Sequence, residues 1–553
     1  MRQNIKSNNK APRYVEKYTP QVIPGVKRGF ALGFPNDYFC GMSNLGLQVI
    51  YKTINARGDT ACERFFLEER TADTGLRPLK TIETARPVRD FPLIGLTLSF
   101  ELDYFNVVKI IEQIGMPIYA AERTENQPLL IGGGPCATAN PEPIADLFDI
   151  FVIGEGEDVI NEILDCHYTG QDKKFSRQEL LIELSGIPGV YVPTLEKQSV
   201  ERQTKKNFST LPPASSAIVA KDTEFSSMFL LEIARGCGRH CRFCMAGYCT
   251  RPPRVCDLEL LKTALEQPLD DNLRVGLVGC AISDYPWADE LCEHLLVNKI
   301  NFSVASLRAD SVSDVMLNAL ATSGHKTVTF APEAGSERLR AIINKTITRE
   351  HIISAVERST SAGIPNVRLY FMIGLPFEQL EDIQGIVELS AAVVKIVKSN
   401  SPRGRLTLSV NPFIPKPHTP FQRLPYVDSV VLRERYDYLK TEIAKLPGVE
   451  LKTEDLRQAA VQAMLARGDR GMAKLIVEAA KYGGFKAWKR VLKANGIGSE
   501  KLLSGFEEAE QLPWSHIDCG VNEHFFSMEL AAAINQKYSA SCFADCKKCG
   551  VCK

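Results

Sequence analysis

No stretch of the 553-residue chain is apolar enough to cross a membrane. Such a segment needs about 18 consecutive apolar residues, and every apolar run in this sequence is shorter. The first residues, MRQNIKSNNKAPRYVEKYTP, have no apolar core of the kind that a signal peptide carries. We therefore expect a cytoplasmic protein with no membrane partner.

The chain also lacks net charge. It has 66 Lys and Arg residues against 66 Asp and Glu residues, so its formal net charge at pH 7 is +0. A strongly basic balance would indicate a polyanionic partner, and its absence disfavours nucleic acid. Histidine is scarce as well: the chain has 8, and residues 1–166 contain none.

Cysteine, by contrast, is abundant, with 16 residues. In the reducing cytosol a cysteine-rich chain more often binds metal or performs redox chemistry than forms disulfides. Two clusters stand out, one within ARGCGRHCRFCMAGY (234–248) and one within SCFADCKKCGVCK (541–553). Most of the scattered cysteines are expected to be small buried apolar side chains.

The pattern of apolar segments predicts an α/β fold in three parts. After an N-terminal extension (1–30), residues 31–200 alternate buried strands such as LIGLTLSF with amphipathic helices, which predicts a Rossmann-like, doubly wound parallel sheet. Residues 201–425 contain six strand candidates with helices between them, which predicts a partial (β/α)6 barrel of the TIM type. Residues 426–553 carry amphipathic helical spacing and predict a mostly helical C-terminal domain that ends in a four-cysteine metal site.

The first cysteine cluster follows the first predicted barrel strand. Thiolates hold iron–sulfur clusters, and a [4Fe–4S] cubane has four corners to ligate. Cys237, Cys241 and Cys244 can hold three irons and leave the fourth open to a small molecule. The alternative is a structural zinc site, in which His240 would serve as the fourth ligand.

This spacing resembles the radical S-adenosylmethionine (SAM) superfamily, and the order of the downstream strands agrees with it. In that family the open iron chelates SAM, and an electron from the cluster cleaves SAM to a 5′-deoxyadenosyl radical. The motifs LVGCAIS, SLRAD and APEAGSERLR lie at predicted strand ends, where the family binds SAM. The resemblance implies SAM contacts from Phe243, Gly279, Ser306, Arg308, Glu333, Ser336 and Arg338.

A glycine-rich stretch, LLIGGGPCATANPEPIADLFDIFVIGEGED (129–158), marks the first domain. Alone it fits a nucleotide site or plain tight turns equally well. Before a radical SAM barrel, it resembles the cobalamin-binding domain of cobalamin-dependent radical SAM enzymes. Other cobalamin domains supply a histidine below the cobalt from an Asp-x-His-x-x-Gly motif; we expect no such motif here, and residues 1–166 contain no histidine. The resemblance therefore implies a cobalt with a weak or absent lower ligand, which favours Co(I) and methyl transfer; a domain that has lost cobalamin is the alternative. The cobalamin contacts implied are Asn44, Gly132, Gly133, Gly134, Pro135, Thr138, Gly154, Glu155 and Gly156.

The second cluster consists of Cys542, Cys546, Cys549 and Cys552. Four thiolates in one short segment can close a metal site, and iron, zinc or a second iron–sulfur cluster all fit. The tail resembles the four-cysteine iron site of the arginine C-methyltransferase of methanogens that modifies methyl-coenzyme M reductase.

Together the resemblances imply a cobalamin-dependent radical SAM C-methyltransferase that acts on an unactivated carbon. Its expected substrate is a peptide or protein side chain, with glutamine or arginine of methyl-coenzyme M reductase as the specific hypothesis. A ferredoxin or flavodoxin is expected as electron donor. One alternative is a radical SAM enzyme without methyl transfer, such as a cyclase or an RNA-modifying enzyme with a non-catalytic cobalamin domain. Another is an iron–sulfur redox or assembly protein.

Overall fold

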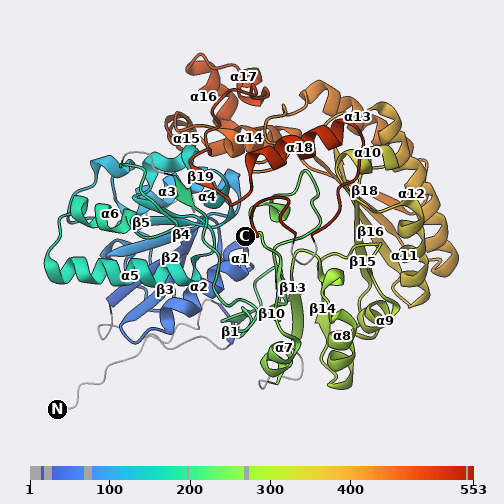
Figure 1. Ribbon diagram of the computed structural model, residues 1–553, viewed down its shortest axis with the longest axis horizontal. Coiled ribbons are helices and arrows are strands. Elements are labelled where there is room, and N and C mark those ends of the chain that lie inside the picture. The colour runs from blue at the N-terminus through green and yellow to red at the C-terminus, as the bar shows by residue number, and fades with distance from the viewer. Residues whose placement is uncertain are drawn as a thin grey trace, which may run out of the picture.

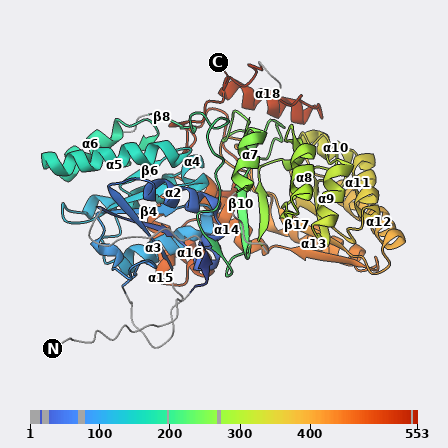
Figure 2. The same cartoon turned by 90° about the horizontal axis from the view of Figure 1, so that it is seen from below.

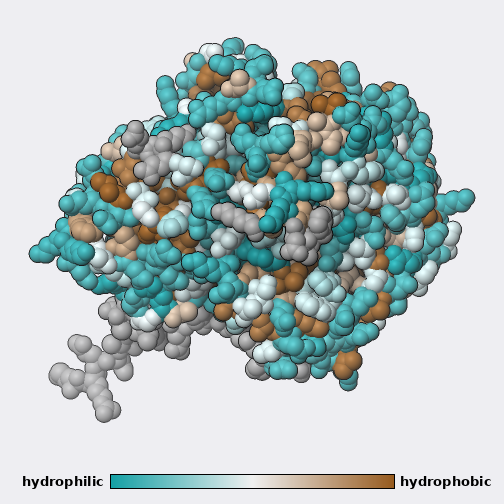
Figure 3. Space-filling model, in the orientation of Figure 1, coloured by the Kyte–Doolittle hydropathy of each residue, from teal (hydrophilic) through white to brown (hydrophobic). Residues whose placement is uncertain are grey.

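The chain folds into two parallel α/β sheets that lie side by side, with C-terminal helices across one side of both (Figures 1 and 2). Hydrophilic side chains cover most of the face seen in Figure 3, interrupted by small hydrophobic patches. Within the residues described, no helix is both long and apolar enough to span a bilayer. The computed structural model describes residues 14–17, 28–67, 78–195, 199–266, 273–542 and 546–552.

The N-terminal domain is built on a six-stranded sheet in the order β3-β2-β4-β5-β6-β7. The first five strands are parallel and only β7 runs antiparallel to its neighbour β6. The strand order reverses beside β2, so the crevice between the carboxyl ends of β2 and β4 is the place where such folds bind ligands. The predicted Rossmann-like fold is therefore confirmed. The strands are β2 (Arg28–Phe34), β3 (Thr60–Phe66), β4 (Leu93–Thr97), β5 (Leu129–Gly133), β6 (Ile150–Val152) and β7 (Val190–Tyr191).

Helices cover both faces of this sheet. One face packs against α2 (Leu45–Asn55), α5 (Gly156–Lys173) and α6 (Arg177–Ser185). The other packs against α3 (Tyr104–Ile114), whose buried residues recur at helical spacing because a single stripe faces the core. That second face is completed by α14 (Leu456–Arg467), α15 (Met472–Lys481) and α16 (Trp488–Ala494).

The barrel has seven parallel strands, one more than the sequence predicted. A three-stranded sheet, β10-β13-β14, joins a four-stranded sheet, β15-β16-β17-β18, through a bridge between Leu307 and Phe330. The partial-barrel architecture is thus confirmed. The strands are β10 (Met228–Glu232), β13 (Arg274–Val278), β14 (Phe302–Ser303), β15 (Thr327–Glu333), β16 (Asn366–Ile373), β17 (Leu406–Pro412) and β18 (Val449–Thr453), and the helices are α7 (Leu258–Leu265), α8 (Ala288–Val297), α9 (Asp314–Thr322), α10 (Glu337–Ile342), α11 (Arg349–Ser361), α12 (Leu380–Asn400) and α13 (Ser429–Ile443).

The C-terminal part is mostly helical, as expected, but its first residues and several of its helices pack with the other two domains. Residues 429–453 still belong to the barrel, because β18 pairs along β17. The helices that follow contribute Leu465, Ile476 and Trp488 to the core beneath α3. Shorter elements complete the fold: α1 (Tyr38–Met42), α4 (Pro135–Ala139), α17 (Ser499–Leu503), α18 (Glu523–Ile534), and the paired strands β1 (Glu16–Lys17) with β9 (Val219–Ala220), β8 (Val200–Glu201) with β19 (Ile517–Asp518), and β11 (Ala234–Arg235) with β12 (Arg254–Val255).

The contribution of α15 to the N-terminal core can be measured. Ile476 is 0% exposed, so Ile476→Ala should lower the free energy of unfolding by about 2–5 kcal/mol through lost burial and a residual cavity. Ile182→Ala on α6 is the matched control, because Ile182 is 50% exposed and should change stability by less than about 0.5 kcal/mol. Guanidinium denaturation followed by circular dichroism makes the comparison. Equal stability of the two variants would show that α15 does not complete this core.

Candidate functional site

The three-cysteine loop begins where the first barrel strand ends. After β10 the chain forms β11, turns at Gly236 with φ +81°, and enters the loop. Cys241 is buried, and Cys237 and Cys244 are half-buried. Burial and then the nearby thiols of Cys241 and Cys237 raise the pKa of Cys244 to about 12. The thiols therefore lie close together, and positive charge at this place would be needed to hold them as thiolates.

Three thiols on one short loop are the donor set of a [4Fe–4S] cluster that leaves one iron open. A zinc site needs its ligands about 2.0–2.3 Å from a single centre, whereas each cysteine of a cubane binds a different iron. His240, the candidate fourth zinc ligand, instead places its Nε2 3.1 Å from Sγ of Cys542.

A cavity of about 410 Å³ lies at the carboxyl edge of the N-terminal sheet and opens onto the barrel. Its N-terminal wall is largely apolar, with Phe30 and Leu32 from β2 and Ile131 from β5. Its barrel wall comes from the ends of β10 and β13 and from β11. Eight of the nine residues predicted to contact cobalamin line it, namely Asn44, Gly132, Gly133, Gly134, Pro135, Gly154, Glu155 and Gly156, and the barrel contributes Glu232, Arg235, Thr250 and Val278.

Glycines shape this cavity in two distinct ways. Gly154 has φ +105°, and a Cβ there would overlap the backbone of Gln203. Gly133 has room for a Cβ, whose nearest neighbour would be Cβ of Val152 at 4.0 Å, so a side chain there would occupy the open wall. The ninth predicted residue, Thr138, does not line the cavity; its Oγ1 accepts a hydrogen bond from N of Gly154 at 2.9 Å and fixes the turn.

The expectation that the chain has no Asp-x-His-x-x-Gly motif is wrong. Asp165, His167 and Gly170 form an Asp-x-His-x-x-Gly match, the pattern that supplies a lower cobalt ligand in other cobalamin domains. The structure places His167 within α5, about 16 Å along the helix axis from its first residue at 1.5 Å per residue. There it lines a different cavity, at the opposite edge of the sheet. The match in letters therefore does not bring a histidine to the glycine-rich turns.

The residues predicted to contact SAM lie at or just beyond the ends of barrel strands. The side chains of several of them, however, already bind other side chains of the protein. Ser336 caps α10 and donates to Asp382, and Arg338 also pairs with Asp382. Arg308 donates to Asp310 at 2.7 Å, and Glu333 lies 3.4 Å from Lys345.

The remaining predicted SAM residues have fewer polar partners. Phe243, like Met372, packs against an apolar cluster that includes Ala334 and Leu375, just beyond the ends of β15 and β16. Gly279 follows β13 and lies beside Ala234, so it approaches the start of the cysteine loop. Ser306 is half-buried between β14 and the Leu307 bridge.

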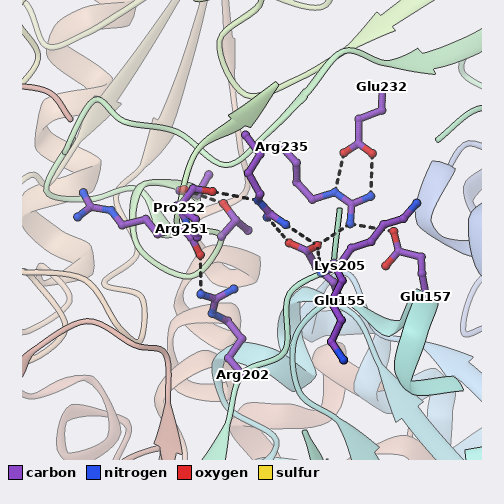
Figure 4. A network of polar contacts seen from close by, with 12 residues as sticks. Glu155, Glu157, Arg202, Lys205, Glu232, Arg235, Arg251 and Pro252 are labelled. Atoms are coloured by element: carbon purple, nitrogen blue, oxygen red, sulfur yellow. Dashed lines mark hydrogen bonds and ion pairs between the residues drawn. The ribbon is translucent and has the colours of Figure 1, made fainter. Parts of the chain in front are cut away.

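The sequence did not predict the buried ion cluster that lies in the cavity wall (Figure 4). Oε2 of Glu155 accepts hydrogen bonds from Nη1 of Arg235 and Nη1 of Arg254, both at 2.9 Å. Arg235 also binds Glu232 at 2.7 Å and Glu157 at 2.8 Å. Burial alone would raise the pKa of Glu155, but the Arg254 hydrogen bond and the Arg235 charge outweigh it and hold that pKa below its usual value. The cluster is formed by residues from both domains.

The C-terminal tail covers the outer side of the cysteine loop. Arg242, which is fully buried, donates to Oε2 of Glu529 on α18 at 2.9 Å and to O of Lys537 at 2.8 Å. N of Cys542 donates to O of Gly238 at 2.7 Å. Of the four tail cysteines, Cys546 and Cys549 are buried, Cys542 is half-buried and Cys552 is exposed, and within the described part of the chain these thiols do not surround a single ion.

Comparison with known proteins places this geometry in a family. Residues 46–193 match the family model described as radical SAM proteins, N-terminal, and residues 231–390 match the radical SAM superfamily. The uncharacterized protein MJ0966 of Methanocaldococcus jannaschii is 31% identical over 453 residues, which cover 81% of this chain and 90% of that protein. The uncharacterized methyltransferase PH0819 of Pyrococcus horikoshii is 23% identical over 335 residues, which cover 54% of this chain and 64% of that protein.

A solved structure shares the fold. The radical SAM methyltransferase TsrM from Kitasatospora setae, with tryptophan substrate and a SAM analogue bound, aligns with a TM-score of 0.51 and 13% identity, covering 85% of this chain and 100% of that one. The two family models cover the N-terminal domain and the barrel in the order in which the chain builds them, and the cysteine loop lies within the second. The chain belongs to the radical SAM superfamily.

Proposed function

We propose that the protein is a cobalamin-dependent radical SAM C-methyltransferase. The observation that carries this proposal is the shared cavity of about 410 Å³, because its walls come from the glycine-rich turns of one domain and the strand that leads into the cysteine loop of the other. A cofactor held there would lie next to a cluster on that loop. The match to an uncharacterized methyltransferase supports the same activity.

The residues of the chain supply binding, orientation and exclusion of water. When bound, the [4Fe–4S] cluster and SAM supply a carbon radical, and cobalamin supplies the methyl group. Cys237, Cys241 and Cys244 would ligate the cluster. The glycine turns let the backbone approach a large planar ligand closely, while Phe30 and Leu32 keep water from that side of the cavity.

The substrate proposal is a peptide or protein side chain, and specifically glutamine or arginine of methyl-coenzyme M reductase. It rests on the similarity of the cysteine tail to the arginine C-methyltransferase of methanogens. Mass spectrometry of the reductase from cells that lack this gene tests it: one methyl group should disappear, and an unchanged methylation pattern would remove this substrate.

The tail is proposed to bind a second metal, iron or zinc, once Cys542 turns from His240 toward the other three thiols. A reduced ferredoxin or flavodoxin in the cytoplasm is the proposed electron donor. The alternative activity, radical SAM chemistry without methyl transfer, is favoured if the protein binds no cobalamin.

Loss of one loop cysteine should abolish the cluster. Cys241→Ala leaves two thiolates, too few to hold a cubane, so the electron paramagnetic resonance signal of the reduced cluster and the 5′-deoxyadenosine formed from SAM should both fall to background. Cys292→Ala in α8 is the control, because Cys292 is equally a buried barrel cysteine but lies in the helix layer. A wild-type protein that contains zinc and no inorganic sulfide would contradict the assignment.

Filling the cavity wall should weaken cobalamin binding without unfolding the protein. Gly133→Ala adds a methyl group in open space, and the affinity for hydroxocobalamin should fall roughly 10- to 100-fold, since overpacking costs about 1–3 kcal/mol. The visible absorption bands of cobalamin give the titration. Gly58→Ala, at an exposed turn with nothing near its Cβ, should bind as the wild type does, and so should His167→Ala. Weaker binding in His167→Ala would instead make that histidine the lower ligand.

A further inference from the structure

Two arginines face each other at the base of the cysteine loop. In the short ribbon of β11 and β12, Arg235 is the register partner of Arg254. Like charges directly opposite each other on paired strands destabilise the pair. Both guanidinium groups also lie over the ring of Phe208, at 5.0 and 5.2 Å, and their side chains are 16% and 13% exposed. The ribbon therefore needs negative charge from elsewhere.

Glu232 of β10 supplies part of that charge to Arg235, at 2.7 Å, and the N-terminal domain supplies the rest. Glu155, in the turn between β6 and α5, binds Arg235 through Oε2 and Arg254 through both oxygens. Oε2 also accepts a hydrogen bond from N of Lys205 at 2.8 Å. With four donors on two oxygens, the Glu155 carboxylate has little capacity left for a cofactor, although Glu155 lines the cavity.

The two arginines flank the cysteine loop in the sequence. Residues 236–253, which join β11 to β12, contain all three cysteines of the loop. Arg235 precedes this segment and Arg254 follows it, so one carboxylate holds both ends. Figure 4 shows Glu155 and Glu157 reaching from the N-terminal domain to Arg235.

We infer that Glu155 is a positioning residue: it fixes both ends of the cysteine loop against the cofactor cavity and so sets the separation between cluster and cobalamin. This inference rests on the proposed function. The contact of Glu155 with cobalamin stays a prediction beside this role, since Glu155 lines the cavity.

Glu155→Gln tests the inference, because it keeps the shape of the side chain and removes the negative charge that binds both arginines. In protein as purified, amide hydrogen exchange in residues 236–253 should become at least about tenfold faster, since local opening of this segment is favoured. The control is Asp149→Asn, which removes the charge of an even more deeply buried ion pair with Arg123 (2.8 Å) within the N-terminal domain alone. The control should leave exchange in the loop unchanged.

A second measurement reports the separation itself. Protein reconstituted with iron, sulfide and hydroxocobalamin and then reduced contains two paramagnetic centres, cob(II)alamin and the cluster. Glu155→Gln should retain both centres and lose part of the faster spin relaxation that the cluster imposes on cob(II)alamin, whereas Asp149→Asn should retain it.

The outcomes separate the two hypotheses. Wild-type protein that binds no cobalamin overturns the proposed function, and the exchange measurement then still decides the role of Glu155 in holding the loop. Loop exchange and spin relaxation that match the wild type in Glu155→Gln overturn the inference. An equal change in Asp149→Asn also overturns it, because the effect would then be general loss of stability.

Discussion

Parallel strands end at one edge of their sheet, and in this chain the carboxyl edges of two such sheets meet at one cavity. The site depends on a fixed arrangement of these two sheet edges. Buried charge fixes that arrangement: Glu155 and Glu157 of the N-terminal domain bind arginines of the barrel, and burying those charges without their partners would carry a large desolvation cost. The ion cluster around Glu155 is thus both an interdomain contact and part of the wall of the site.

The two domains are also joined by the chain itself. Helices made after the barrel return to cover the N-terminal sheet, so Trp488 packs against Phe105 across more than half of the sequence. His418, in the segment after β17, lies 3.1 Å from O of Ala139. The cavity therefore lies in a molecule whose halves share cores and polar contacts, which suits a site that must hold several groups in fixed relation.

Local patterns predicted the fold where burial is complete. The strands LIGLT and LLIGG were found because both faces of their sheet are covered and the sequence is continuously apolar. β18, VELKT, was missed because it is an edge strand that pairs only with β17 and leaves charged side chains exposed. The amphipathic spacing of α14–α16 indicated a buried face, but spacing cannot say which of two sheets the face covers.

The parts of the site that are continuous segments of sequence could be predicted. The cysteine loop is one such segment and each glycine turn is another, and the spacing of residues within each indicates its chemistry. Glu155 and its partners Arg235 and Arg254 lie 80 and 99 residues apart, so no local pattern reveals them. Ser336 and Arg338 illustrate the converse: their positions match a ligand-binding motif, yet their side chains are bonded to Asp382.

The contact between the tail and the cysteine loop has a consequence for biosynthesis. Cys542 and its contact His240 lie 302 residues apart in the sequence, and Arg242 and its partner Glu529 lie 287 residues apart. A ribosome makes the loop long before it makes the segment that covers it. The outer side of the loop is therefore uncovered while the barrel is being translated, and it is covered only after the last helix has been made.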